Sequence, residues 1–170
     1  TNSAGILWTH DGSGTITNAT TISPTYTPDA SDVGTVTLTL TVSGNGSCAD
    51  AVDTKDLTIT DAPTADAGAA TDEVCVDAIY TVSDAAVTNS AGILWTHNGS
   101  GTITGGTETT LTPQYNPVAA DAGNTVTLTL TVTGNGSCAD AVDTKALTIT
   151  DAPTADAGAA AEVCEDTPFT

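Results

Sequence analysis

The stretch that decides the fold is Thr125-Val-Thr-Leu-Thr-Leu-Thr-Val-Thr133, in which polar and apolar residues alternate without interruption. Successive side chains of a β-strand point to opposite faces, so the valines and leucines share one face and the threonines share the other. The pattern predicts a strand with one buried and one solvated face. Gly134-Asn-Gly136 follows as a tight-turn signal, and residues 145–150 are predicted to return as the last strand.

The same strand occurs twice because the chain contains an internal repeat. Residues 1–10 recur letter for letter as 88–97, and residues 44–55 recur as 134–145, an offset of 90. A unit of this length fits a small β-sandwich and is too long for most solenoid repeats.

The repeated segment Asp-Ala-Pro-Thr-Ala-Asp-Ala-Gly places Pro63 and Pro153 at the ends of modules. This punctuation predicts three parts: 1–62 as the C-terminal part of one module, 63–152 as a complete module, and 153–170 as the first strands of the next. The chain is therefore interpreted as a window on a longer tandem array.

Shorter apolar runs supply the remaining strands of the module at residues 63–152. Residues 78–82 and 93–95 are predicted strands, the second of them central, and residues 63–76 are predicted to run along an edge. Trp95 is the only tryptophan of this module and, with its counterpart Trp8, is the expected core anchor. The sequence predicts an all-β fold of tandem immunoglobulin-like sandwiches, with about seven strands per module, arranged as a linear rod.

Composition excludes several classes of function. The chain has 2 Lys+Arg against 21 Asp+Glu and a formal net charge of -19, so no basic surface exists for nucleic acid. No apolar run is long enough to span a membrane, so no membrane insertion is predicted. His10 and His97 stand alone without a nucleophile pattern or close metal-ligand spacing, so no enzymatic activity and no zinc site are predicted.

Several motifs carry a resemblance to a known family. Tyr115-x-Pro-x-x-x-Asp121-x-Gly ahead of the alternating strand, and the segment that begins at Trp95, resemble the PKD-type immunoglobulin-like repeat. The pairing of Glu-Val-Cys75 with Gly-Asn-Gly-Ser-Cys138 is similar to repeats of giant Bacteroidetes surface adhesins exported by the type IX system, the SprB-like gliding-motility adhesins. The resemblance implies an extracellular, cell-surface filament that contacts a substratum and is moved by a motor.

Three functions remain open from the sequence. The first is a structural stalk or spacer in surface attachment or gliding motility, with neighbouring modules as partners, a surface or glycan at a distal tip, and motility and secretion machinery. The second is a binding module whose variable loop 105–110 contacts a glycan or protein. The third is an accessory module of a secreted hydrolase.

The four cysteines recur two per module, which favours disulfides in an exported β protein. A bond between Cys75 and Cys138 within one module is disfavoured, because the two residues are expected at opposite ends of the sandwich. A bond between Cys75 and the counterpart of Cys138 in the following module is slightly favoured, and free thiols are the remaining alternative. The cysteines are Cys48, Cys75, Cys138 and Cys164.

Acidic residues cluster near the module boundaries, and calcium is a possible ligand there because it prefers several oxygens. No dense calcium-loop motif appears, so no cofactor is expected and a solvated acidic surface is the favoured interpretation. Asp32 and Asp121 are predicted to cap turns. The weak calcium candidates are Asp61, Asp66, Asp72, Asp151 and Asp156.

Overall fold

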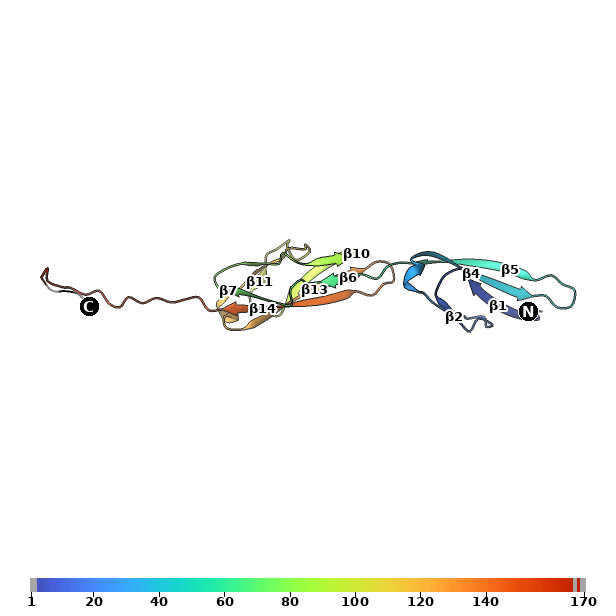
Figure 1. Ribbon diagram of the computed structural model, residues 1–170, viewed down its shortest axis with the longest axis horizontal. Coiled ribbons are helices and arrows are strands. Elements are labelled where there is room, and N and C mark those ends of the chain that lie inside the picture. Colours follow the sequence, from blue (N-terminus) through green and yellow to red (C-terminus); the bar gives the residue numbers. More distant parts are fainter. Residues whose placement is uncertain (1–2, 167, 169–170) are drawn as a thin grey trace.

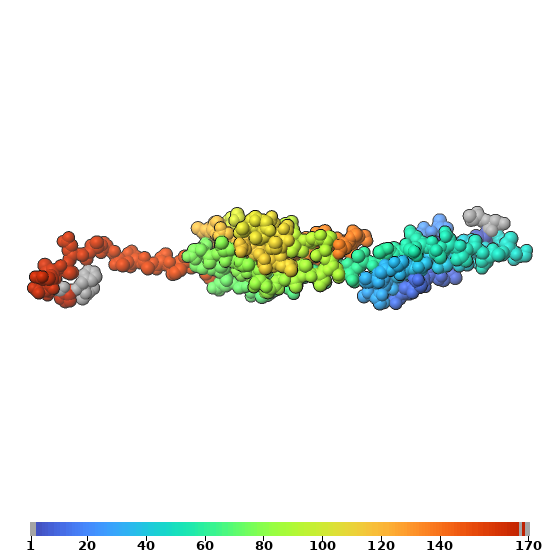
Figure 2. All heavy atoms as spheres, turned by 90° about the horizontal axis from the view of Figure 1, so that it is seen from above, coloured from blue at the N-terminus to red at the C-terminus, as the bar shows by residue number. Residues whose placement is uncertain are grey.

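The computed structural model describes residues 3–166 and 168, and it is built almost entirely of β-strands. Two sandwiches lie end to end, and residues 151–166 continue as extended chain along the same axis (Figures 1 and 2). In chain order the strands are β1 Gly5–His10, β2 Thr15–Thr17, β3 Thr25–Thr27, β4 Gly34–Ser43, β5 Ala51–Ile59, β6 Thr64–Asp66, β7 Thr71–Cys75, β8 Tyr80–Thr81, β9 Ala86–Thr88, β10 Ser90–His97, β11 Thr102–Ile103, β12 Gln114–Asn116, β13 Thr125–Gly134 and β14 Ala141–Thr150, with 3-10 turns η1 Ala30–Asp32 and η2 Ala119–Asp121.

The second module has two facing sheets in immunoglobulin-like order. One sheet runs β10-β13-β14-β7, and the opposite layer contains β11-β12-β8 and the pair β6-β9. The first strand changes sheets, because β6 pairs antiparallel with β9 whereas β7 pairs parallel with β14. Since β6 and β7, like β8 and β9, are consecutive segments of one strand, nine segments make seven strands. The all-β, immunoglobulin-like prediction is confirmed.

The core follows from the alternation in β13. Val126, Leu128, Leu130 and Val132 are buried, whereas the threonines between them lie on the other face. These four side chains pack with Trp95, Leu147 and Ile149, all nearly inaccessible, in one cluster. Trp95 is 2% exposed and is the largest side chain of that cluster.

In the described residues from Ser3 onward, the first module contains the counterparts of β10 to β14 only. Its sheet runs β1-β4-β5, and the described residues contain no strand on the outer side of β5 where β7 covers β14. Consequently Ile59 and Trp8 are half-buried, although their counterparts Ile149 and Trp95 are buried. Trp8 lines an open apolar hollow instead, with Ser3, Ile6, Ile22, Leu40 and Val42.

Two details differ from the sequence-based expectation. The strand that contains residues 93–95, β10, is an edge strand of its sheet and not a central one, and its Trp95 N–H donates to Glu108 O of a loop at 2.7 Å. The last strand begins at Ala141 and not at Lys145, because Ala141 to Asp143 pair with β13 after a short loop.

Candidate functional site: a buried lysine, a module junction and a hollow beside Trp95

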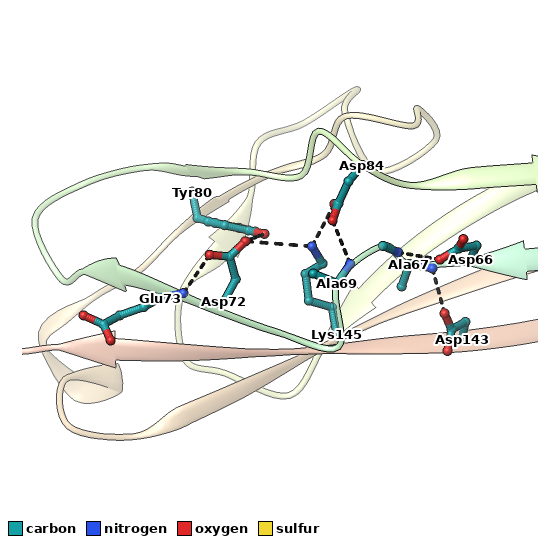
Figure 3. Close-up of polar contacts among 10 residues, drawn as sticks. Asp66, Ala67, Ala69, Asp72, Glu73, Tyr80, Asp84, Asp143 and Lys145 are labelled. Carbon is teal, nitrogen blue, oxygen red and sulfur yellow. Dashed lines mark hydrogen bonds and ion pairs between the residues drawn. The ribbon is translucent and has the colours of Figure 1, made fainter.

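Lys145 lies at the centre of a polar cluster inside the second module (Figure 3). Its side chain is 0% exposed and its Nζ donates to Asp84 Oδ1 at 2.8 Å. Asp72 Oδ2 lies 3.9 Å from the same Nζ and accepts a hydrogen bond from Tyr80 at 2.7 Å. The two carboxylates compensate a charge that would be costly to bury alone.

Both acidic partners are held in the charged form. The hydrogen bond from Lys145 and a second one from Ala69 N keep the pKa of Asp84 below its usual value. The hydrogen bonds from Tyr80 and from Glu73 N do the same for the pKa of Asp72. Because β7 carries Asp72 and the segment before β9 carries Asp84, this cluster ties the first two strands of the module to the last one.

Asp121 forms a second buried polar centre, at the turn before β13. Its side chain is 3% exposed and accepts hydrogen bonds from the backbone N–H groups of Ser100 at 2.7 Å, Gly101 at 3.0 Å and Val118 at 3.2 Å. Tyr115 donates its hydroxyl to the same carboxylate at 2.8 Å. The prediction that Asp121 caps this turn is confirmed, and the tyrosine bond adds a link to β12.

The first module repeats this turn with Asp32. The Asp32 carboxylate accepts hydrogen bonds from the Tyr26 hydroxyl at 2.6 Å and from Ser13 N at 2.6 Å. The bond from Tyr26, followed by the bonds from backbone N–H groups, lowers the pKa of Asp32 to about 2. The carboxylate also accepts from Asp29 N, as the predicted turn cap requires. The polar centre is therefore part of the repeat and independent of the strands that the first module lacks.

A short connection, residues 60–63, joins β5 to β6 and is contacted by Asn89 and Cys138 of the second module. Asn89 Nδ2 donates to Ala62 O at 3.2 Å, and Asn135 Nδ2 donates to Asn89 O at 2.6 Å. The loop between β13 and β14 reaches back across the boundary, because Cys138 Sγ lies 3.5 Å from both Thr60 O and Asp61 O. Loops of the second module thus contact the end of the first module.

The cysteines are distributed along the rod. Cys75 ends β7 beside Thr150, at the far end of the second module, whereas Cys138 faces the junction. Cys48 occupies the loop between β4 and β5, and Cys164 lies in the extended segment after β14. Within residues 3–166 and 168 the structure contains no disulfide.

The acidic candidates for calcium do not converge. Asp66 and Asp156 each accept from the backbone N–H of a glycine two residues later, Gly68 and Gly158, at 2.8 Å. Asp72 belongs to the lysine cluster described above. In the described part of the chain, no three His, Cys, Asp or Glu side chains lie together as metal ligands would, and this holds also for Asp61 and Asp151.

A hollow of about 410 Å³ lies beside the core tryptophan of the second module. Among the described residues, His97 Nδ1 and Glu108 Oε2 are buried polar atoms without a hydrogen-bond partner. The His97 ring packs edge-on against Tyr115, with ring centroids 5.0 Å apart. The residues that line the hollow are Trp95, Thr96, His97, Thr102, Ile103, Gly105 and Glu108.

Sequence reasoning missed the lysine cluster and this hollow. In the sequence Lys145 stands out only as one of two basic residues. One signal was present: Lys145 lies on the same, inward-facing side of an alternating strand as Leu147 and Ile149. The hollow had a weaker signal, since its loop at 105–112 is the place where the two copies differ most in length.

No protein-family model matches the chain, and no curated protein matches it. Among solved structures, an I-band fragment of titin matches 87% of this chain over 54% of its own length, with 14% identity and a TM-score of 0.43. Mouse clustered PcdhgC3 EC1-3 matches 88% of this chain over 56% of its own, with 14% identity and a TM-score of 0.41. An endo-fucoidan hydrolase of glycoside hydrolase family 107 matches 87% over 24%, with 16% identity and a TM-score of 0.34.

The chain spans between about a quarter and just over half of these solved chains. Its assignment as a tandem of immunoglobulin-like modules follows from its own strand order. In the described residues, no helix has the length and apolar character needed to cross a membrane.

Proposed function

We propose that this chain is a section of a tandem array that forms the stalk of an extracellular adhesin filament at the cell surface. The stalk holds a distal tip, which binds a surface or glycan, away from the cell. Neighbouring modules are its direct partners, and motility and secretion machinery act at its base. In this proposal the chain serves surface attachment or gliding and has no enzymatic activity.

The observation that carries the proposal is the end-to-end junction (Figures 1 and 2). The last strand of one module passes through residues 60–63 directly into the first strand of the next. The Asn89 side chain donates to Ala62 O of that connection, and the Asn135 side chain in turn donates to Asn89 O. Near-identical copies with such short connections suit a spacer, because a spacer needs many equivalent units. The high negative charge also favours an extended and soluble rod, since like charges repel.

The proposal predicts that length grows in proportion to the number of modules. We expect chains with one, two or three further copies of residues 63–152, inserted after Ala152, to gain about 40 Å each, from a ten-residue strand plus its connection. Small-angle X-ray scattering measures this maximum dimension. Freely jointed modules would instead lengthen with roughly the square root of their number, and that result would contradict a stalk.

A matched pair of insertions controls the scattering experiment. Two residues inserted between Asp151 and Ala152 should increase the bend at that junction without unfolding either module. The same insertion within residues 105–112, where the copies already differ by two residues, should leave the length unchanged. Equal effects at both places would mean that the junction does not set the shape.

A second candidate function is supported by the hollow beside Trp95. The unpartnered polar atoms of His97 and Glu108 beside the hollow suit a hydroxyl-rich ligand such as a glycan. The first copy lacks this arrangement, because Ala19 occupies the position of Glu108: the carbonyl oxygen of each residue accepts the backbone N–H of the tryptophan in its own module. In that copy His10 Nδ1 contacts Gly12 O at 3.1 Å.

Glu108→Ala separates the two candidates, because it gives the second module the residue of the first. If the hollow binds a glycan, the wild-type protein should bind to glycans immobilised on an array. Glu108→Ala should then abolish this binding without changing the thermal stability of the protein. Glu73→Ala, which removes an exposed carboxylate outside the hollow, is the control. The stalk proposal expects no glycan retention by either protein.

A further inference from the structure

The two cysteines of the second module lie beside opposite ends of β14. Cys75 is in register with Thr150, the last residue of β14, whereas Cys138 precedes the first residue of that strand, Ala141. Ten residues of extended chain separate these ends, a span of about 33 Å against a Cα separation of at most about 7 Å in a disulfide. A bond within one module would therefore require the sandwich to come apart.

The Cys138 thiol points instead at the preceding module. Its Sγ lies 3.5 Å from Thr60 O and 3.5 Å from Asp61 O, at the end of β5. The side chain is partly buried there, in a hollow that it lines together with Pro28 and Thr60. Its position is thus fixed by the packing of one module on the next.

The repeat shows which residue of a preceding strand would lie beside Thr60. Thr60 corresponds to Thr150 at the offset of 90, and in the second module Thr150 is the register partner of Cys75. Thr150 O accepts the backbone N–H of Val76, the residue after this cysteine, at 3.0 Å. Thr60 O and Thr150 O are therefore equivalent carbonyls. Cys138 contacts this carbonyl from the following module, and the segment after Cys75 bonds to it within its own module.

We propose that each junction is closed by a disulfide between Cys138 of one module and the cysteine at the position of Cys75 in the module before it. Cys75 itself then pairs with the counterpart of Cys138 in the module that follows. Neighbouring parallel strands are about 4.8 Å apart, so the register partner of Thr60 lies within disulfide reach of a sulfur that already contacts Thr60 O. The inference depends on the tandem arrangement and does not depend on adhesion.

The oxidation is a two-electron thiol–disulfide exchange. One cysteine, as the thiolate, attacks the disulfide of a thiol oxidoreductase or of oxidised glutathione and forms a mixed disulfide. The second cysteine displaces the carrier sulfur, so one S–S bond forms in the protein. The carrier's S–S bond is reduced, and it leaves with the two electrons and the two protons of the cysteine thiols.

Such a bond would transmit tension past the four-residue connection. Load on residues 60–63 would be shared with a covalent link between the β13–β14 loop and the strand at the position of β7. Every module would then be joined to its neighbour twice, once through the main chain and once through sulfur.

The test uses the whole chain lengthened by a second copy of residues 63–152 after Ala152. Both versions carry Cys48→Ser and Cys164→Ser. The junction version adds Cys138→Ser in the first copy and Cys75→Ser in the second, so its two remaining thiols flank one junction. The within-module version adds Cys75→Ser and Cys138→Ser in the first copy, so both remaining thiols belong to the second copy.

Each folded protein is exposed to oxidised glutathione, and its intact mass and its alkylatable thiols are measured before and after reduction. We expect the junction version to lose two hydrogen atoms and both thiols, and the within-module version to keep both thiols. In urea both versions should cross-link, which shows that the thiols are reactive when the modules are unfolded. A cross-link in the folded within-module version, or intact thiols in the folded junction version, would overturn the proposal.

Discussion

Asp121→Ala is expected to lower the free energy of unfolding of the second module by about 3 kcal/mol, because one buried and two partly buried backbone N–H groups and the Tyr115 hydroxyl lose their acceptor. For a module of this size the loss corresponds to a fall in Tm of more than about 10 °C. Thermal unfolding gives the total change, and hydrogen exchange of β13 peptides assigns it to the second module.

The effect of Asp121→Ala should depend on pH in a defined direction. Burial raises the pKa of the Asp121 carboxyl, but the hydrogen bonds from Ser100, Tyr115 and the other donors outweigh it and hold the pKa below its usual value. A depressed folded-state pKa stabilises the protein above the unfolded-state pKa of about 4, and this stability is lost as the pH falls through the folded-state value. The difference between wild type and variant should therefore shrink below about pH 4.

Two variants control this prediction. Tyr115→Phe removes one of the four hydrogen bonds to Asp121, together with the bond that the Tyr115 hydroxyl accepts from Gly101 N, and should cost about 1 to 2 kcal/mol. Burial, followed by the hydrogen bond to Asp121, raises the pKa of Tyr115 to about 12, so that contribution should persist to alkaline pH. Asp32→Ala breaks the equivalent centre of the first module and should leave exchange in β13 unchanged. A small effect of Asp121→Ala at neutral pH would show that water replaces the carboxylate.

Asp84→Ala is expected to destabilise the second module by about 2 to 3 kcal/mol, because it leaves the buried Lys145 ammonium with only the more distant Asp72. The loss is below that of a fully buried pair, since the Asp84 side chain is 42% exposed. Urea unfolding at neutral pH measures this change. Because the Lys145 hydrogen bond lowers the pKa of Asp84, the stabilisation should fade as the pH drops below about 4.

Lys145→Met distinguishes the cost of an unpaired charge from the value of the pair. An apolar side chain of similar length should fit the core position with a change below about 1 kcal/mol. The double variant with Asp84→Ala should be more stable than Asp84→Ala alone. The control is Lys55→Met, because this equivalent lysine is exposed in the first module. If Lys145→Met were as damaging as Asp84→Ala, the pair itself would stabilise the module.

Local patterns determined the class of fold. The alternation in residues 125–133 requires one buried face, and the exact recurrence of 44–55 as 134–145 requires two equivalent strands with equivalent loops. These features act over a few residues, so they predicted β13, its Gly-Asn-Gly loop and the turn cap at Asp121. The last strand was placed too short, because Ala141 to Thr144 have no strong pattern of their own.

Only the tertiary structure decided the contacts between distant segments. Lys145 is buried because β7 pairs parallel with β14 and brings Asp72 over it, and Tyr80 of β8 in the opposite layer donates to Asp72. The equivalent Lys55 is exposed, because the described residues contain no strand beside β5 at that position. The Cys138 thiol meets Thr60 O only through the packing of one module on the next. The sequence by itself determined repeated sandwiches, since periodicity is local. Strand pairing across many residues decided the buried charge and the direction of each cysteine, because the energies that fix them arise only when those segments meet.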